Sequence, residues 1–243
     1  MPFAVPPAPS QGIQLRITFP QRGFTLTELA VVLAIVALLL GGMLIPLSAQ
    51  QDIRARSESE KALNEIREAL IGFAAANGRL PRPATSATNG MENATICATD
   101  AACSGFIPWA TLGTAKLDGH GKLIRYSVTP AYANGAIALT SVANRTVQTR
   151  DAAGAVIDLA TPVPAIIFSQ GKGRWGTTDS GSALADGSAT NADEDTNNTG
   201  PTSYISRLAT DITTGTGGEF DDIVIWLPTN ILFNRMIAAG RLP

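Results

Sequence analysis

One carboxylate lies where a carboxylate is costly. Glu28 immediately precedes the uncharged run LAVVLAIVALLLGGMLIPL, which extends from Leu29 to Leu47. An ionisable side chain within an apolar segment normally marks function, because its charge costs free energy unless a partner compensates it. Glu28 is therefore the first candidate functional residue, and it needs a cationic partner.

The chain has two cysteines, Cys97 and Cys103, and one histidine, His120. This composition excludes a zinc site built from cysteine and histidine clusters. In an oxidising compartment the two thiols are close enough in sequence to close a small disulfide loop. The alternative is a pair of free thiols that pack as small hydrophobic groups. We expect a Cys97–Cys103 disulfide that shapes a loop.

The segment 177–200 is small, polar and acidic, and it contains no lysine or arginine. Carboxylates and carbonyls in a loop can bind calcium, and the candidate ligands are Asp186, Asp193 and Asp195. Their spacing is not that of an EF-hand, so a solvated acidic loop is the competing interpretation. Asp221 and Asp222 could be paired carboxylates or part of a solvated turn, and the turn is favoured. Calcium is the only cofactor considered; otherwise none is expected.

The run 171–176, GKGRWG, fits the G-x-G-x-x-G pattern of dinucleotide-binding loops. That site also needs a helix directly after the glycines, to hold the pyrophosphate at its N-terminus. The polar stretch that follows predicts no helix, so a plain glycine-rich loop is the better interpretation. The chain also lacks a G-x-S-x-G motif, and its one histidine lies between glycines. We therefore expect no enzyme.

Two stretches predict one long N-terminal helix. The run Leu29 to Leu47 spans ~28 Å as a helix, close to the roughly 30 Å of a bilayer core. The following residues, 51–77, carry an apolar stripe at helical spacing, formed by Leu63, Ile66, Leu70 and Phe73. Asn77–Gly78 supplies a stop signal. We expect interruptions at Gly41–Gly42 and at Pro46.

Beyond the helix, short alternating segments predict a β-rich head with a loop at Ala84 to Ala102. The expected strands are Lys122 to Thr129, Ala136 to Val142, Thr146 to Leu159 with a turn at Asp151 to Gly154, Val163 to Ser169, Tyr204 to Leu208 and Ile223 to Leu227. No helical periodicity separates them, which favours an antiparallel or mixed sheet. A last helix, Asn230 to Ala239, is expected after a Thr229 cap and before Gly240. The predicted fold class is α+β.

The stretch Arg22 to Leu29, RGFTLTEL, leads directly into the apolar run. It resembles the cleavage and methylation signal of type IV prepilins and type II secretion pseudopilins. The resemblance implies that a prepilin peptidase cuts after Gly23 and that the new N-terminus, Phe24, is N-methylated. It also implies a pilin fold, in which a long helix packs on a head with its second half. The cationic amine at Phe24 would then be the partner of Glu28, within one subunit or between neighbours.

The resemblance divides the chain into four parts. A leader occupies 1–23, a transmembrane half of the helix 24–50, an amphipathic half 51–77 and a globular β-rich head 78–243. The implied location is the inner membrane, crossed once with the head in the periplasm, and then a pilus or pseudopilus filament. The implied partners are prepilin peptidase and other pilin or pseudopilin subunits.

The expected function is that of a structural subunit, minor rather than major, of a type IV pilus or a type II secretion pseudopilus. Nucleic acid is not an expected partner, because the net charge of -2 gives no basic field. Two plainer interpretations of the apolar run stay open: a signal peptide cut after Ala49, and an anchor that is never processed. Both lead to the alternative function, a membrane-tethered or secreted periplasmic ligand-binding domain without filament assembly.

Overall fold

The computed structural model describes residues 23–243, and for residues 40 and 42–47 it describes the backbone only. The predicted leader, 1–23, therefore lies outside the described residues except for Gly23. The chain divides into two compact units, residues 1–47 and 48–243.

The first element is helix α1, Leu26–Asn77. The predicted interruptions at Gly41–Gly42 and Pro46 were wrong, because the helix assignment continues through all three residues. A helix tolerates glycine at a cost of about 1 kcal/mol and proline at about 3 kcal/mol, so these residues need not end a long helix. The predicted stop is confirmed, since α1 ends at Asn77 and Gly78 adopts a left-handed φ of 74°.

Every residue from 23 to 39 is exposed. Among the residues that the structure describes, no helix combines the length and the apolar character needed to cross a membrane. The transmembrane role of residues 24–50 stays a prediction.

The second unit is built on a four-stranded antiparallel sheet in the order β1-β2-β5-β9. Its strands are β1 Ser104–Phe106, β2 Arg125–Val128, β5 Ala165–Ser169 and β9 Ile223–Leu227. A smaller sheet, in the order β4-β3-β8, consists of β3 Arg145–Arg150, β4 Val156–Val163 and β8 Ser203–Ile205. Here β3 pairs with β4 antiparallel and with β8 parallel, so the head is a mixed β structure.

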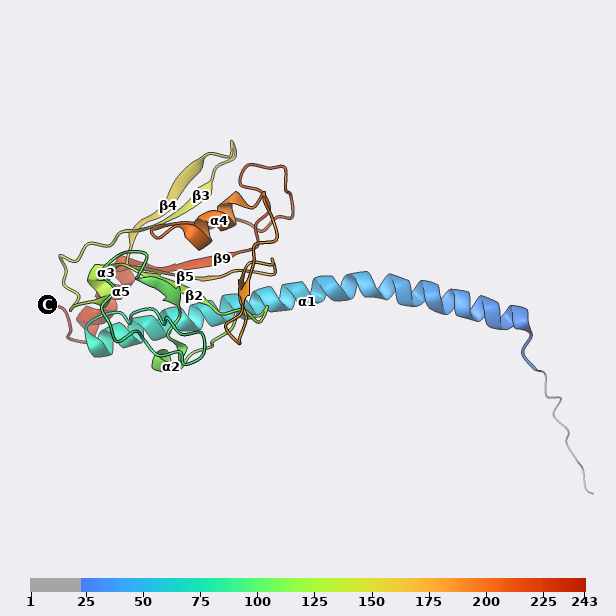
Figure 1. Cartoon of the computed structure of the whole chain (residues 1–243), viewed down its shortest axis with the longest axis horizontal. Coiled ribbons are helices and arrows are strands. Elements are labelled where there is room, and N and C mark those ends of the chain that lie inside the picture. Colours follow the sequence, from blue (N-terminus) through green and yellow to red (C-terminus); the bar gives the residue numbers. More distant parts are fainter. Residues whose placement is uncertain (1–22) are drawn as a thin grey trace, which may run out of the picture. The chain divides into compact units, whose positions relative to one another are not determined.

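The remaining elements are short. A hairpin joins β6 Gly176–Thr177 to β7 Ala183–Leu184. The helices of the head are α2 Trp109–Leu112, α3 Pro130–Ala133, α4 Ala192–Thr199 and α5 Thr229–Ala238. Figure 1 shows β2, β5 and β9 lying over the C-terminal half of α1, with α4 and the β3–β4 hairpin on the opposite side of the sheet.

The main sheet buries both of its faces. On one face lies the α1 stripe, formed by Leu63, Ile66, Leu70, Ile71 and Ala74, in a core shared with side chains from the sheet and α5. Phe73, predicted as part of this stripe, is only half-buried and lies under the Arg79 guanidinium, outside the core. On the other face a smaller core joins Ile166 and Phe168 to residues of the second sheet. This explains why β5 reads AIIFS and is buried at all five positions, a continuous apolar pattern typical of a strand covered on both sides.

The sequence pattern predicted most of these elements. The antiparallel hairpin with its turn at Asp151 to Gly154 is confirmed, and the strand Ile223 to Leu227 is confirmed with its bounds. The strand at Ala136 to Val142 was wrong. Ile137 donates its backbone N–H to Gly78 O at 2.8 Å, so this segment packs on the end of α1 without joining a sheet.

The last helix is confirmed, but its cap is not. Thr229 is the first residue of α5, Pro228 occupies the cap position, and no side chain caps the helix. The Thr229 hydroxyl instead donates to Pro162 O at 3.3 Å. The expectation of no helix between the strands was also wrong, since α4 forms in the polar stretch 177–200. Helix α4 has no apolar stripe; polar contacts of its side chains hold it in place instead.

Leu70→Ala tests the contact between α1 and the sheet. Leu70 is fully buried in the larger core, so its truncation should lower the free energy of unfolding by about 3 kcal/mol. Thermal and denaturant unfolding measure the loss. Glu68→Ala, an exposed change on the same helix, should alter stability by less than about 0.5 kcal/mol; equal losses for the two variants would contradict the described packing.

Candidate functional site

The first turn of α1 holds Glu28 in a reciprocal capping arrangement with Thr25. The Thr25 backbone N–H donates to Glu28 Oε2 at 2.8 Å, and the Thr25 hydroxyl donates to the same oxygen at 2.8 Å. In return, the Glu28 backbone N–H lies 3.2 Å from Thr25 Oγ1. This is the capping box T-x-x-E, which satisfies otherwise unpaired N–H groups at a helix start. Glu28 therefore has a hydrogen-bond partner at the start of its own helix.

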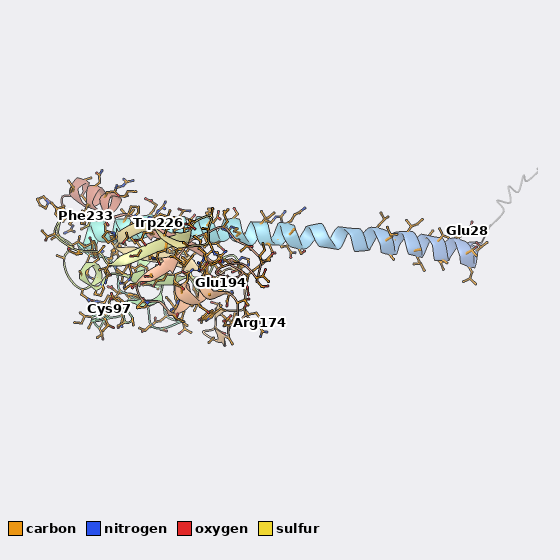
Figure 2. The ribbon with its side chains drawn as sticks, turned by 90° about the horizontal axis from the view of Figure 1, so that it is seen from above. Glu28, Cys97, Arg174, Glu194, Trp226 and Phe233 are labelled. Atoms are coloured by element: carbon orange, nitrogen blue, oxygen red, sulfur yellow. A yellow bond between two sulfur atoms is a disulfide. The ribbon has the colours of Figure 1, made fainter. Side chains whose placement is uncertain are left out.

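The residues around Glu28 form an apolar surface. Phe24 and Leu26 are 86% and 88% exposed, and large apolar side chains over the next turns are 42–78% exposed: Leu29, Val31, Val32, Leu33, Ile35, Val36, Leu38 and Leu39. Figure 2 shows Glu28 at the start of α1, with side chains leaving this part of the helix in several directions. A helix that is apolar all round is suited to lipid or to neighbouring helices.

The comparisons with known proteins bear on this same segment. Residues 19–44 match the family model for the prokaryotic N-terminal methylation motif. This segment is a type IV prepilin-like signal. The match includes Gly23, Phe24 and Glu28, so the resemblance drawn from RGFTLTEL is confirmed. Searches of curated proteins and of solved structures found no match. The prepilin-like signal thus identifies the N-terminal segment, and the head is described from its own geometry.

The predicted disulfide is present. Cys97 and Cys103 are bonded, and both are buried in the larger core. The loop between them is anchored to α3 through Asn134, whose amide donates to Cys97 O at 2.7 Å and accepts from Cys97 N at 3.1 Å. The predicted loop at Ala84 to Ala102 is also confirmed, since it contains no helix and no strand.

The disulfide loop places the Asp100 carboxylate against the buried side chain of Arg145. Asp100, inside the loop, accepts from Arg145 Nη1 at 2.7 Å, and the Arg145 side chain is completely buried. Arg145 also donates to Ser127 Oγ at 2.8 Å and to Val128 O at 2.6 Å. The hydrogen bond from Arg145 is the main cause that lowers the pKa of Asp100. The loop therefore supplies the counter-charge of a cation that β3 buries against β2.

Asp100→Asn should destabilise the protein at neutral pH by about 2 kcal/mol, because it removes the negative partner of a buried guanidinium. The pKa of Asp100 is depressed by folding, so its contribution is present above pH 3.8, its ordinary value, and is lost as pH falls through the lower folded pKa. Urea unfolding of wild type and variant at pH 7 and pH 2.5 measures this. A gap that stays equally large at pH 2.5 would show that the carboxylate charge is not the cause.

The side chain of Lys122 organises the glycine-rich loop 171–176. The ammonium of buried Lys122 donates to Gln170 O at 2.9 Å, to Trp175 O at 2.8 Å and to Gly173 O. Helix α4 begins only at Ala192, far from the position that a dinucleotide site requires. The preference for a plain glycine-rich loop agrees with this geometry. Burial lowers the pKa of Lys122, and the nearby carboxylate of Asp221 opposes that shift.

The structure does not gather Asp186, Asp193 and Asp195 into one set of ligands. Asp193 is buried, and its two oxygens accept from Arg150 at 2.6 Å and from Arg207 at 2.6 Å. These arginines lie outside the segment 177–200, which is why the segment alone suggested unpaired acids. Asp186 accepts from Asn191 Nδ2 at 3.1 Å, and Asp195 is half-buried on α4.

A different acidic group forms in the head. Oxygens of Glu194, Asp221 and Asp222 lie within 4.8 Å of one another, and we call these three residues the acidic cluster. Glu194 comes from α4, and the two aspartates directly precede β9. Asp222 is buried and accepts from Asn197 Nδ2 at 2.8 Å, so the solvated turn expected at Asp221–Asp222 was wrong.

The acidic cluster is electrostatically strained. Burial raises the pKa of Glu194 and of Asp221. Burial also raises the pKa of Asp222 well above its ordinary value, and the charge of Glu194 adds to this shift. The sequence signal for the cluster was weak, because Glu194 and Asp221 are far apart in the chain and the helix that presents Glu194 has no apolar stripe. Only the adjacent pair Asp221–Asp222 was visible beforehand.

Proposed function

We propose that this chain is the precursor of a minor subunit of a type IV pilus or a type II secretion pseudopilus. Prepilin peptidase cuts it after Gly23, and the N-terminal helix carries it into the filament. The observation that supports this most directly is the prepilin-like signal at 19–44, which coincides with an exposed apolar helix carrying one acid, Glu28, in its first turn. The motif belongs to structural proteins, so the proposed role is assembly and no catalysis is assigned.

The proposal places residues 24–50 in the inner membrane and the head in the periplasm. The apolar character of the run Leu29 to Leu47 supports this placement, as does its length. The Cys97–Cys103 disulfide supports an oxidising location for the head. The irregular loops of the head favour a minor subunit over a major one.

Processing changes what Glu28 can bind. In the uncut chain residue 24 has an uncharged peptide nitrogen, and Glu28 is held by Thr25. Cleavage after Gly23 converts that nitrogen into a cationic amine, and methylation preserves its charge. Glu28 then has a cationic partner at Phe24 of its own chain or of a neighbour, which neutralises a carboxylate that is costly in an apolar surrounding. A misregistered neighbour would leave the charge unpaired.

The cleavage itself is the first test. The full chain is expressed in the presence and absence of a prepilin peptidase, purified from membranes, and analysed by intact mass and N-terminal sequencing. We expect a start at N-methyl-Phe24 when the peptidase is present and the uncut chain when it is absent. A start at Gln50, with or without the peptidase, would instead support a secreted ligand-binding domain. An uncut chain under both conditions would support a tethered one.

Two substitutions at Glu28 separate its charge from its capping role. Glutamine can still accept the capping hydrogen bonds, whereas alanine cannot. Because the proposal rests on charge, both Glu28→Gln and Glu28→Ala should reduce recovery of the subunit in sheared filaments at least tenfold while membrane insertion continues. Filament recovery is measured by immunoblot against the membrane fraction. Normal assembly of Glu28→Gln would show that Glu28 acts through capping and not through charge pairing.

A further inference from the structure

One arginine inside the head has no acidic partner. Arg125 lies on β2, where its directly paired neighbours are Phe106 on β1 and Phe168 on β5. Phe168 belongs to the smaller core, so Arg125 lies on that face of the main sheet. Its guanidinium carbon is 5.1 Å from the centre of the Phe106 ring. In the part of the chain that the structure describes, no hydrogen bond or ion pair joins the Arg125 side chain to another residue.

Burial makes this missing partner unfavourable. Five buried side-chain atoms lack a hydrogen-bond partner among the described residues, and Arg125 Nε is the one nitrogen in that group. Burial lowers the pKa of Arg125, and the interaction that opposes this shift comes from Tyr204 and not from a carboxylate. A guanidinium nevertheless stays protonated in proteins. The head therefore holds a positive charge without compensation, in a place where an unpaired charge is strongly destabilising.

Arg145 shows how the same face of the sheet compensates a buried cation. Its Nε donates to Ser127 Oγ at 2.8 Å, and Ser127 lies two residues along β2 from Arg125, so the two cations share one face of that strand. The disulfide loop brings Asp100 to Arg145 as its counter-charge, at 2.7 Å. The fold thus provides an acid for one of the two arginines. For the other, an anion from solution can fill the same role.

A cavity of about 160 Å³ lies beside Arg125. Its walls come from β2, β5, β8 and the C-terminal end of α4, on the side of the main sheet opposite α1 (Figure 1). The aromatic rings of Phe168 and Tyr204 line it, with their centres 5.6 Å apart. Apolar ring surface beside an unpaired cation suits an organic anion better than a bare inorganic one.

Most polar side chains around the cavity are already engaged. The amides of Asn197 and Asn198 bond to protein groups, as do the hydroxyls of Ser104, Tyr126 and Thr199. The Tyr204 hydroxyl has no hydrogen bond to any described residue, and its effect on Arg125 indicates that the two groups are close. Among the described residues that line the cavity, the guanidinium and this hydroxyl are the free side-chain donors.

We propose that this cavity binds one small organic acid through its carboxylate. The planar guanidinium of Arg125 binds the two carboxylate oxygens as a fork, and the Tyr204 hydroxyl donates to one of them. The apolar part of the acid lies against the rings of Phe168 and Tyr204. A single carboxylate neutralises a single guanidinium. The C-terminal end of α4, which reaches the cavity at 197–200, carries partial negative charge and disfavours a doubly charged anion such as phosphate.

This site adds a ligand to the proposed structural subunit and does not depend on processing or on filament assembly. Binding of an acid in the head can be measured on the uncut chain. A failure of the binding experiment therefore leaves the proposed function standing, and the reverse also holds.

Saturation-transfer NMR of the full chain in a nonionic detergent tests the site with sodium butyrate as the probe. Butyramide has nearly the same size and shape but no charge, so it is the matched control ligand. We expect saturable binding of butyrate with a dissociation constant of about 1 mM or less. Butyramide should bind at least tenfold more weakly. Butyrate should also raise the melting temperature of the chain, because it binds the folded state.

Substitutions at Arg125 and Tyr204 locate the binding. Arg125→Gln should weaken butyrate binding at least tenfold. Arg125→Lys keeps the charge but not the fork, and Tyr204→Phe removes the hydroxyl, so each should weaken binding about threefold. Arg235→Gln makes the same change at an exposed arginine of α5 and should leave binding unchanged. Arg125→Gln leaves no partner charge behind, so its melt without butyrate should stay cooperative, at an equal or higher temperature.

Two results with wild type alone would overturn the proposal: no saturable butyrate binding up to about 10 mM, or equal binding of butyrate and butyramide. Both stand even if a variant fails to fold. Wild-type affinity in a cooperatively folded Arg125→Gln chain would also contradict it. Tighter binding of phosphate, or of a glutamate capped at both ends to mimic a peptide side chain, would overturn the assignment to a small organic acid.

Discussion

The head depends on the burial of one apolar stripe of α1 against the main sheet. Leu63, Ile66 and Leu70 are fully buried there, and the strands that cover them are joined only through non-local antiparallel pairings. A four-stranded sheet with one uncovered apolar face is not stable in water, and the helix supplies the missing layer. The disulfide loop, the second sheet and α4 are all built outward from this helix–sheet contact.

The sequence predicted the parts of the structure that follow from local pattern. The stripe of α1, its stop at Asn77–Gly78, the hairpin around Asp151 to Gly154 and the prepilin-like signal each depend on residues close together in the chain. The same logic wrongly predicted a strand at Ala136 to Val142, where Ile137 is buried in the larger core but Leu139 and Val142 are exposed. Local periodicity records that a segment is half-buried, but the partner that buries it is a tertiary property.

The candidate sites divide in the same way. The Cys97–Cys103 bond joins neighbours in sequence and could be predicted. The acidic cluster brings together Glu194 of α4 and the two aspartates that directly precede β9. The sequence could not show that Arg150 and Arg207 pair with Asp193, one of the acids proposed in the segment 177–200. Charge patterns within one segment cannot show which charges another segment neutralises. Helix α4 was missed for a related reason, since its stability comes from these polar contacts and not from an apolar face.

Strand β5 separates two cores with alternate residues. Ile167 packs in the core that contains α1, and its neighbour Ile166 packs in the core beneath the second sheet. Adjacent side chains on one strand thus pack in opposite halves of the head. If those halves unfold as one cooperative unit, a perturbation on one side can reach the other through the backbone of β5, and also through β9, whose Ile223 and Val224 lie in different cores. The strands shared by the two cores therefore help to decide whether the head unfolds in a single transition or layer by layer.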